Sequence, residues 1–397
     1  MYQTRLHLNQ ATDSGEYGPA QRALLDRADV AAARAEIAGW PGYDRTPLLI
    51  RDAMAADAGV AAVWCKHEGY RFGIGSFKPT GPTYAMLNVL KNEVRKAVGV
   101  EPTTRGLLDG EHAQVAGNVV VTAATSGNHG RALAWGARTF GCRAVIYMNE
   151  EVSAGRARAI AGFGAEVVRV PGSFDAAVHR CSEDATARGW LVISDYPSPD
   201  YPEVPRVIMQ GYAVVAAEIC EQLAEPPTHL FVPGGGGVLA GGICGCLWER
   251  LGSNRPRIVL VEPDASRCLY ESARAGSMAR VPSAASIMDG LVVEEPSAAA
   301  WPLVRGGAFA FLAVEDQAAV DAMRQAAHPP DGDPPAVIGD TGSAAWAGFL
   351  AATADPDLRR HLGLDATSRV VIIATEAATD PEVYRRIVGV GPETVSG

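Results

Sequence analysis

The sequence has 397 residues, enough for two to three domains at roughly 150 residues each. Hydrophobic residues make up 48% of the chain and charged residues 20%, a composition typical of a soluble globular protein. The net charge of −10 at pH 7 argues against nucleic acid or an anionic membrane as the main partner, because both require a basic face.

Short β-branched runs alternate along the chain with amphipathic stretches of helical length. The runs typical of strands cover residues 62–66, 118–123, 144–147, 166–170, 191–194, 229–232, 258–261, 309–314 and 370–374. The segments expected to be helical cover residues 131–140, 154–162, 174–188, 206–221 and 238–250. Segments 271–306 and 328–335 lack a regular pattern, so we expect them to be irregular.

This alternation predicts the fold class, an α/β protein with mostly parallel sheets covered by helices. Nine strands are many for one open sheet, so we expect two α/β domains with a cleft between them. Ligands bind at the carboxyl ends of parallel strands, which is where four motifs of this sequence fall.

The first motif is RFGIGSFKPTG at residues 71–81. Lys78 lies in a Gly/Pro-punctuated turn between the 62–66 strand and a helix that begins near Gly81. A lysine that forms a Schiff base must be partly desolvated, and the neighbouring Phe77 favours that environment. Taken alone, the segment also fits an exposed loop lysine.

The second motif is TSGNHG at residues 125–130, which joins a strand to a helix. Thr125, Ser126, Gly127 and Asn128 place backbone N–H groups and short side chains at a helix N-terminus, a site suited to a carboxylate. An ordinary N-cap by Ser126 or Asn128 explains the pattern equally well. His129 fits a residue of the first helical turn better than a catalyst.

The third motif is a run of four glycines, Gly234 to Gly237, between an apolar strand and a helix. Four glycines carry a high ordering cost, and close approach of the backbone to a phosphate accounts for them. A tight strand–helix turn would need only one or two glycines. The run matches neither the P-loop nor the dinucleotide-binding pattern.

The fourth motif is the end of the 370–374 strand, where a buried run stops at Thr375. A neutral hydroxyl there can hydrogen-bond a heteroaromatic nitrogen without forcing it to be protonated. Alone this signal is weak, because strands often end in threonine.

In this order the four motifs resemble the fold-type II pyridoxal-phosphate-dependent enzymes, the group of tryptophan synthase β, cysteine synthase and threonine deaminase. Within that group the chain is most similar to the diaminopropionate ammonia-lyases. The shared features, which extend over roughly residues 45–385, are RFG…FK at 71–78, VPRVIMQGY at 204–212, VEPD at 261–264, IMDGL at 287–291 with EP at 295–296, GDTGSA at 339–344 and TEAATDPEVY at 375–384.

The resemblance implies pyridoxal 5'-phosphate as the cofactor and a role for each matching residue. Lys78 would carry the cofactor as a Schiff base and move the Cα proton of the substrate. The cofactor-binding set would be Lys78, Phe77, Asn128, Gly234, Gly235, Gly236, Gly237, Val238, Leu239 and Thr375. The substrate carboxylate would bind Thr125, Ser126 and Gly127, and Asp195 would address a substrate amino group. Residues 1–80 plus 205–397 would form the large cofactor-binding domain and residues 81–204 the small substrate-side domain.

Two departures from the lyase pattern bear on the reaction. Ser126 stands where the ammonia-lyases have an acidic residue that serves as the base for the D-isomer. A hydroxyl is a far weaker base than a carboxylate, so activity on D-isomers is in doubt. Val293 stands where the lyases carry a cysteine opposite Cys268, so we expect no disulfide there.

The expected activity is α,β-elimination on a small β-substituted amino acid such as 2,3-diaminopropionate, giving pyruvate and ammonia. Three alternatives stay open: a β-replacement synthase like cysteine synthase, a serine or threonine deaminase, and a non-catalytic amino-acid-binding protein. Ser126 favours the first two, because cysteine synthases and threonine deaminases have a serine there. Retention of Lys78, Asn128, the glycine run and Thr375 argues against the last.

The remaining expectations concern partners and location. We expect a small amino-acid substrate, no nucleic acid, no membrane, no metal, and a homodimer, as is common in this group. The seven cysteines fit neither a disulfide framework nor a zinc site, and Cys244 and Cys246 lie in an expected helix where packing explains them. With a polar N-terminus that lacks a signal-peptide core, this predicts a cytoplasmic protein.

Overall fold

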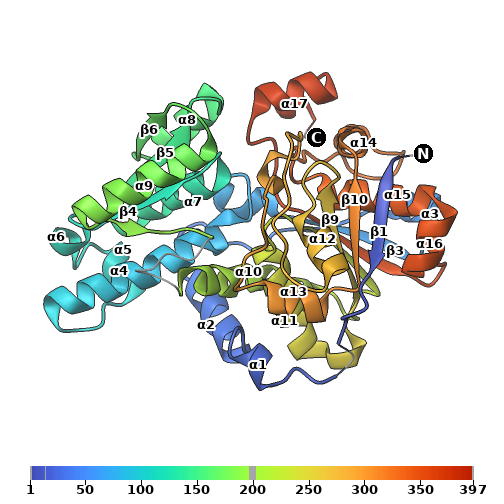
Figure 1. The fold of residues 1–397 in the computed structure, drawn as a ribbon, viewed down its shortest axis with the longest axis horizontal. Coiled ribbons are helices and arrows are strands. Elements are labelled where there is room, and N and C mark those ends of the chain that lie inside the picture. Colours follow the sequence, from blue (N-terminus) through green and yellow to red (C-terminus); the bar gives the residue numbers. More distant parts are fainter. Residues whose placement is uncertain (1, 14, 196–202, 396–397) are drawn as a thin grey trace. The chain divides into compact units, whose positions relative to one another are not determined.

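The computed structural model describes residues 2–13, 15–195 and 203–395. By its internal contacts the chain divides into two compact units (Figure 1). Unit 1 comprises Met1–Ala32, Gly42–Phe77 and Tyr212–Gly397, and unit 2 comprises Ala33–Pro41 and Lys78–Gly211. The expected assignment of the cofactor to one domain and the substrate to the other stays a prediction.

Unit 1 contains, among the described residues, a seven-stranded sheet in the order β1-β10-β9-β8-β11-β3-β2. Its strands are β1 (Thr4–Leu8), β2 (Leu48–Ile50), β3 (Ala62–His67), β8 (His229–Pro233), β9 (Arg257–Pro263), β10 (Ala310–Val314) and β11 (Arg369–Ala374). The five inner strands are parallel, and β1 and β2 pair antiparallel at the two edges. The five parallel strands were predicted from their apolar runs. The two edge strands were missed, because they are short and half-exposed.

One hydrophobic cluster of unit 1 lies against one face of this sheet, where α15 packs on the inner strands together with α3, α14 and α16. Apolar residues occupy nearly every position of α15, and Gly348 lets this helix approach Val261 of β9 closely. The helices that belong wholly to unit 1 are α1 (Pro19–Arg22), α3 (Asp52–Ala58), α11 (Val238–Leu251), α12 (Cys268–Ala275), α13 (Trp301–Gly307), α14 (Asp316–Ala327), α15 (Ala344–Ala354), α16 (Pro356–Leu362) and α17 (Pro381–Val388). The limits of the two units fall within α2 (Arg27–Ala38) and α10 (Val204–Gln222).

Unit 2 contains, in the described part of the chain, a four-stranded parallel sheet in the order β6-β5-β4-β7. Its strands are β4 (Val120–Ala124), β5 (Arg143–Asn149), β6 (Glu166–Val170) and β7 (Leu191–Val192). Its helices are α4 (Pro82–Val98), α5 (Thr104–Leu108), α6 (Ala113–Ala116), α7 (Asn128–Phe140), α8 (Ala154–Ala161) and α9 (Phe174–Arg188).

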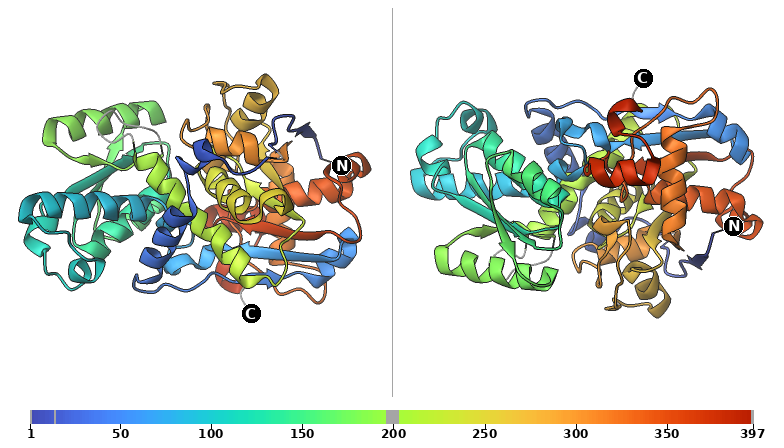
Figure 2. Two further views of the ribbon diagram at one scale, coloured as in Figure 1. Left: turned by 90° about the horizontal axis from the view of Figure 1, so that it is seen from below. Right: turned by 90° about the horizontal axis from the view of Figure 1, so that it is seen from above.

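Helices cover both faces of the small sheet, as two further views of the ribbon show (Figure 2). Val145 and Tyr147 of β5 pack with residues of α9, whereas Ile146 lies against Gly130 of α7. Because successive side chains of a strand point to opposite faces, α7 and α9 lie on opposite sides of this sheet. The predicted α/β class with mostly parallel sheets is confirmed.

Several further expectations can be compared with the structure. Segment 271–306 is not wholly irregular, because α12 extends into it and α13 begins at Trp301, whereas 328–335 has no helix or strand. All seven cysteines are free thiols, and Cys244 and Cys246 are buried in α11 as predicted. The described residues include no helix long and apolar enough to cross a membrane.

Candidate active site

In unit 1, two of the predicted motifs lie at the same edge of the large sheet. β8 and β11 are parallel neighbours, with Ile372 of β11 paired to Phe231 of β8. Gly234 directly follows β8 (His229–Pro233), and Thr375 directly follows β11 (Arg369–Ala374). The strand-end hydroxyl and the glycine turn therefore leave neighbouring strands at their carboxyl ends, the usual position of a ligand site in such sheets.

The glycine turn has a shape that needs glycine. Gly235 and Gly237 have φ angles of 57° and 87°, in the left-handed region that L side chains rarely adopt. A Cβ atom at Gly234 would lie 2.6 Å from Cγ of the buried Glu262, so this position excludes a side chain by packing.

Two N–H groups of the glycine turn are bonded within the protein: Gly234 donates to the Val261 carbonyl at 2.8 Å and Gly237 to the Gly234 carbonyl at 3.2 Å. Among the described residues, neither the Gly235 nor the Gly236 N–H has a hydrogen-bond acceptor. Gly237 caps the N-terminus of α11, a helix of 14 residues, where the helix dipole adds positive potential. The turn therefore provides an anion-binding cradle suited to a phosphate.

Burial gives Glu262, directly beneath the glycine turn, an unusual protonation state. Burial raises the pKa of its carboxyl to about 8, although the N–H groups of Leu269 and Tyr270 donate to it at 3.0 and 2.8 Å. A carboxyl that stays largely protonated at neutral pH adds little negative charge beside a bound phosphate. Glu262 was not predicted as a site residue, and its place in the VEPD motif was the one feature that marked it.

Thr375 is buried, and its hydroxyl oxygen has no hydrogen-bond partner among the described residues. A buried hydroxyl without a partner is costly and is usually satisfied by a ligand or water. The Thr375 carbonyl accepts a hydrogen bond from the N–H of Phe77 at 3.0 Å. The lysine loop is thus tied to the strand end that carries Thr375.

In unit 2, Thr125 and Asp195 follow two neighbouring parallel strands. Thr122 of β4 pairs with Val192 of β7, and Thr125 and Asp195 each come three residues later in the chain. The N–H of Gly127 donates to the Thr125 hydroxyl at 3.1 Å, which fixes the turn that starts α7. α7 has 13 residues, so its N-terminus contributes N–H groups and positive potential at the same edge.

Lys78 and Asp195 form an ion pair in unit 2, with Nζ and Oδ2 3.2 Å apart and both side chains largely buried. Burial alone would raise the pKa of Asp195, but the charges of Lys78 and His129 outweigh it and hold that pKa well below its usual range. The His129 ring is fixed by a contact of 2.8 Å from Nε2 to the Ile193 carbonyl, and its Nδ1 lies 3.7 Å from Asp195 Oδ2. Asp195 is therefore a permanent anion beside the amine.

Lys78 is also singled out by elimination, because the sequence contains only four lysines. The Lys66 ammonium is buried and donates to three protein acceptors. Lys91 pairs with Glu36 at 2.7 Å, and Lys96 pairs with Glu93 on an exposed part of α4. Lys78 alone of the four stands at the start of unit 2 in a turn next to a strand-end carboxylate.

One cation near the TSGNHG turn was not predicted from the sequence. Arg156, in the first turn of α8, donates from Nη1 to the Ser126 carbonyl at 3.4 Å, and its Cδ lies 3.5 Å from a Cβ built on Gly127. A guanidinium here adds positive charge beside the predicted carboxylate site. Arg156 lies next to Ser126 because of the path of the chain between β5 and α8, and no sequence motif marks that path.

Comparison with known proteins agrees with these features. The family described as "Pyridoxal-phosphate dependent enzyme" matches residues 40–376. The chain belongs to this family. Its cofactor is accordingly pyridoxal 5'-phosphate.

Relatives and solved structures narrow the resemblance. The "Diaminopropionate ammonia-lyase" of Salmonella typhimurium is 35% identical over 366 residues, which is 88% of this chain and 89% of that protein. The Escherichia coli K12 protein of the same name is 34% identical over 89% of this chain and 90% of its own length. Crystal structures of the Escherichia coli lyase match with TM-scores of 0.88 (30% identity, complex with D-serine, 100% of this chain and 99% of that one) and 0.87 (30% identity, complex with an aminoacrylate-PLP azomethine intermediate, 98% and 97%).

The residues present fit the cofactor of this family. The glycine turn is a cradle that a Cβ would fill at Gly234 and strain at Gly235 and Gly237, and it suits the phosphate. The partnerless hydroxyl of Thr375 suits the ring nitrogen, and the Lys78 amine suits the aldehyde carbon. Phe77, whose ring centroid lies 4.6 Å from that of Tyr212, donates its N–H to the Thr375 carbonyl and directly precedes Lys78 in the chain. The individual roles of these residues stay predictions.

Four predicted site residues have a less defined place. Asn128 is the first residue of α7 and Ser126 lies just before the helix, so both stand at the predicted carboxylate turn. Val238 and Leu239 are the first two residues of α11, directly after the glycine turn, and both are buried. Cys268 is a free thiol, and its Sγ lies 3.6 Å from the Gly235 carbonyl oxygen.

Proposed function

We propose that this chain is an ammonia-lyase that eliminates the β-amino group of 2,3-diaminopropionate to give pyruvate and ammonia. The observation that carries this proposal is the Asp195 carboxylate. Its Oδ2 lies 3.2 Å from Lys78 Nζ, and its Oδ1 is buried without a partner among the described residues. A permanent anion with one free oxygen beside the reactive amine suits a substrate that carries a cationic β-amine.

Each of the proposed site residues has a separate role in the reaction. Thr125, Ser126 and Gly127 bind the substrate carboxylate at the positive end of α7. Asp195 orients the β-ammonium group and keeps its charge close to the reacting carbon. Lys78 Nζ accepts the proton from Cα when the C–H bond breaks. The cofactor, when bound, accepts the electron pair left on Cα.

The overall reaction balances without any other reagent. The Cα–H bond breaks with the proton moving to Lys78 Nζ, the Cβ–N bond breaks, and the nitrogen leaves with the bonding electrons as ammonia. The enamine product, 2-aminoacrylate, tautomerises and is hydrolysed in water to pyruvate and a second ammonia. One 2,3-diaminopropionate and one water therefore give one pyruvate and two ammonia.

The test compares substrates that differ only in the leaving group. Wild-type and Asp195→Asn proteins are assayed for pyruvate with L-2,3-diaminopropionate and with O-acetyl-L-serine, whose leaving group carries no positive charge. We expect Asp195→Asn to lower kcat/KM for the diamine by about 100-fold, the loss of one charge-assisted contact, and to lower that for the ester far less. Asp109→Asn, which removes a surface ion pair with Arg105 in the same unit, is the matched control.

Two outcomes would contradict this proposal. Equal loss on both substrates would mean that Asp195 supports Lys78 and does not recognise the β-amine. Faster turnover of the ester or of L-serine than of the diamine by the wild-type protein would make the chain a different kind of β-eliminating enzyme. Ser126 favours one such alternative, β-replacement, and a thiol added to the assay would then divert pyruvate into a thioether product.

The position of Ser126 leads to a stereochemical proposal. No carboxylate stands in the TSGNHG turn to remove the Cα proton from the face opposite Lys78, so we propose that the enzyme acts on the L-isomer. Pyruvate formation from the D-isomer should be at least about 100-fold slower, within the usual contribution of a general base. Ser126→Asp should raise the D-isomer rate selectively, and a gain on both isomers would contradict the assignment.

We also propose that the protein is a cytoplasmic homodimer. The seven free thiols support a reducing compartment. The dimer is proposed because enzymes of this group are commonly homodimers. Light scattering on the purified protein decides the oligomeric state, and fractionation of the source cells decides the compartment.

A further inference from the structure

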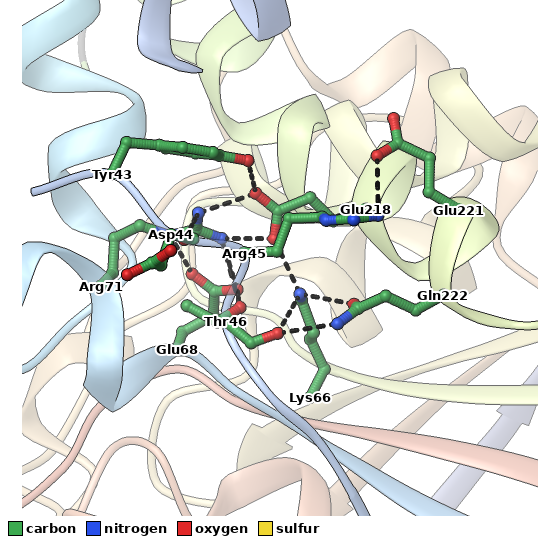
Figure 3. A network of polar contacts seen from close by, with 10 residues as sticks. All are labelled: Tyr43, Asp44, Arg45, Thr46, Lys66, Glu68, Arg71, Glu218, Glu221 and Gln222. Carbon is green, nitrogen blue, oxygen red and sulfur yellow. Dashed lines mark hydrogen bonds and ion pairs between the residues drawn. The ribbon is translucent and has the colours of Figure 1, made fainter. Parts of the chain in front are cut away.

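Four charged side chains form a fully buried cluster in unit 1, which we name the ion-pair cluster: Lys66, Glu68, Arg71 and Glu218 (Figure 3). Each of these side chains has 0% exposure. Arg71 lies seven residues before Lys78 in the chain, and Glu218 is on α10. The cluster therefore includes the residue at which the segment leading to Lys78 begins.

Nearly every donor of the cluster is satisfied, which is why the four charges can be buried together. Arg71 donates to Glu218 from both terminal nitrogens at 2.7 and 2.9 Å and to Glu68 from Nε and Nη2 at 3.0 and 2.9 Å. Lys66 donates to Glu218 at 2.7 Å, to Gln222 at 2.8 Å and to the Thr46 carbonyl at 2.9 Å. Two positive and two negative charges leave no net charge.

Folding stability alone does not explain a cluster of buried charges. Burying charges costs several kcal/mol per ion before pairing, and well-packed apolar residues of the same volume are often as stable. A role for the cluster is therefore expected in the geometry that it imposes. Tyr43 extends this geometry: its hydroxyl donates to Glu218 at 2.8 Å, and the Arg71 guanidinium lies 5.9 Å from its ring centre.

The backbone directly after Arg71 is strained. Phe72 has φ 52° and ψ 18°, and within the described ranges it is the one residue other than glycine with positive φ. A bulky residue in the left-handed region costs about 1–2 kcal/mol and persists only where its surroundings hold it. The Phe72 ring contacts the Tyr43 ring at 6.1 Å between centroids, so one tyrosine touches Arg71, Phe72 and Glu218.

The other end of the loop is held to the end of β11. Ala377 N–H donates to the Gly75 carbonyl at 2.9 Å, and Phe77 N–H donates to the Thr375 carbonyl at 3.0 Å. The backbone from Arg71 to Phe77 is thus fixed at both ends, and Lys78 is the next residue. A change in the bend at Phe72 changes the path of the whole segment.

We propose that Arg71 and Glu218 are positioning residues for Lys78: their buried ion pair, closed by Tyr43, holds the left-handed bend at Phe72 and so fixes where the chain delivers the amine. The inference rests on the proposed role of Lys78 and adds the residues that place it. Neither Arg71 nor Glu218 touches the substrate in this account.

The test uses Glu218→Gln, which keeps the shape and removes the charge, and the double variant Arg71→Met with Glu218→Leu, which replaces this ion pair by apolar side chains of similar volume. Glu36→Gln breaks a comparable ion pair with Lys91, 2.7 Å long, in the other unit, and is the matched control. Hydrogen exchange of the 72–77 backbone amides in the cofactor-free protein is the first readout. The second is the visible circular dichroism of the bound cofactor with kcat and KM.

Glu218→Gln should accelerate hydrogen exchange at residues 72–77 about 10-fold relative to Glu36→Gln, and it should weaken the visible circular dichroism of the bound cofactor. It should also lower kcat by about 100-fold with little change in KM, because the reacting amine is then misplaced. The double variant, if Glu218→Gln does not fold, should give the same pattern. Unchanged exchange at 72–77, or an equal change in Glu36→Gln, would overturn the inference. The exchange readout needs no cofactor or substrate, so it decides the positioning role even if 2,3-diaminopropionate proves not to be the substrate.

Discussion

Gly236 offers a direct test of phosphate binding, because a methyl group there should weaken binding of the phosphate without lowering the stability of the folded protein. Its φ is not in the left-handed region, and a Cβ would lie 3.7 Å from Val293 Cγ1, an ordinary van der Waals distance. Gly236→Ala should therefore leave the folded cofactor-free protein close to wild type in stability. Gly162→Ala, at a surface helix end with nearest contacts of 3.4 and 3.6 Å, is the matched control.

The expected loss in affinity follows from the turn's free N–H groups. A methyl group on the turn keeps the phosphate from the close approach that a Gly236 N–H bond requires. A hydrogen bond to a charged group contributes about 1.5–3 kcal/mol, so losing one bond weakens pyridoxal 5'-phosphate binding about 10- to 150-fold. Pyridoxal lacks the phosphate, so its affinity should not change.

The assay titrates the cofactor-free protein with pyridoxal 5'-phosphate and with pyridoxal and follows the visible absorbance. The prediction is a loss of affinity for the phosphorylated form alone, with the melting temperature of the free protein within about 2 °C of wild type. Equal weakening of both ligands, or no weakening of either, would refute the assignment of the phosphate to this turn.

Three other changes have defined outcomes. Thr375→Val removes a buried hydroxyl that has no partner in the described structure. It should therefore shift the visible spectrum of the bound cofactor and barely change the stability of the cofactor-free protein. An unaltered spectrum would count against Thr375 as the partner of the ring nitrogen. Burial alone would raise the pKa of Glu218, but Arg71 and Lys66 hold it well below the usual range, so its contribution to unfolding free energy is present above about pH 4.5 and lost as the pH falls further. The stability gap between wild type and Glu218→Gln in urea, about 3–5 kcal/mol at neutral pH, should shrink below pH 4.5, and a gap independent of pH would contradict this. Burial raises the pKa of Cys268, so its alkylation should be slow until urea unfolds the protein, and fast labelling of the native protein would show that it is accessible.

The sequence predicted those parts of the fold and site that local patterns determine. All nine expected strands are present, because each is a short, mostly apolar run of strand length. The glycine turn and Thr375 could be placed at strand ends, since Gly234 directly follows the apolar run of β8 and Thr375 directly follows that of β11. Both lie at the carboxyl edge of one sheet, because β8 and β11 are parallel neighbours.

The remaining features depend on contacts between distant residues. Lys78 and Asp195 are 117 residues apart, and Arg71 and Glu218 are 147 apart, so no spacing rule identifies these pairs. Arg71 was quoted only as part of a motif, yet its side chain is central to a buried cluster. Buried charges are hard to find from sequence, because the same residue types are usually exposed and only the tertiary fold supplies their partners.

The most direct test of the whole account is to locate the cofactor on the chain. Reduction of the cofactor-loaded protein with borohydride, followed by digestion and mass spectrometry, marks whichever of the four lysines holds pyridoxal 5'-phosphate. The account predicts a single modified peptide that contains Lys78. A label on Lys66, Lys91 or Lys96, or a protein that takes up no label, would contradict it.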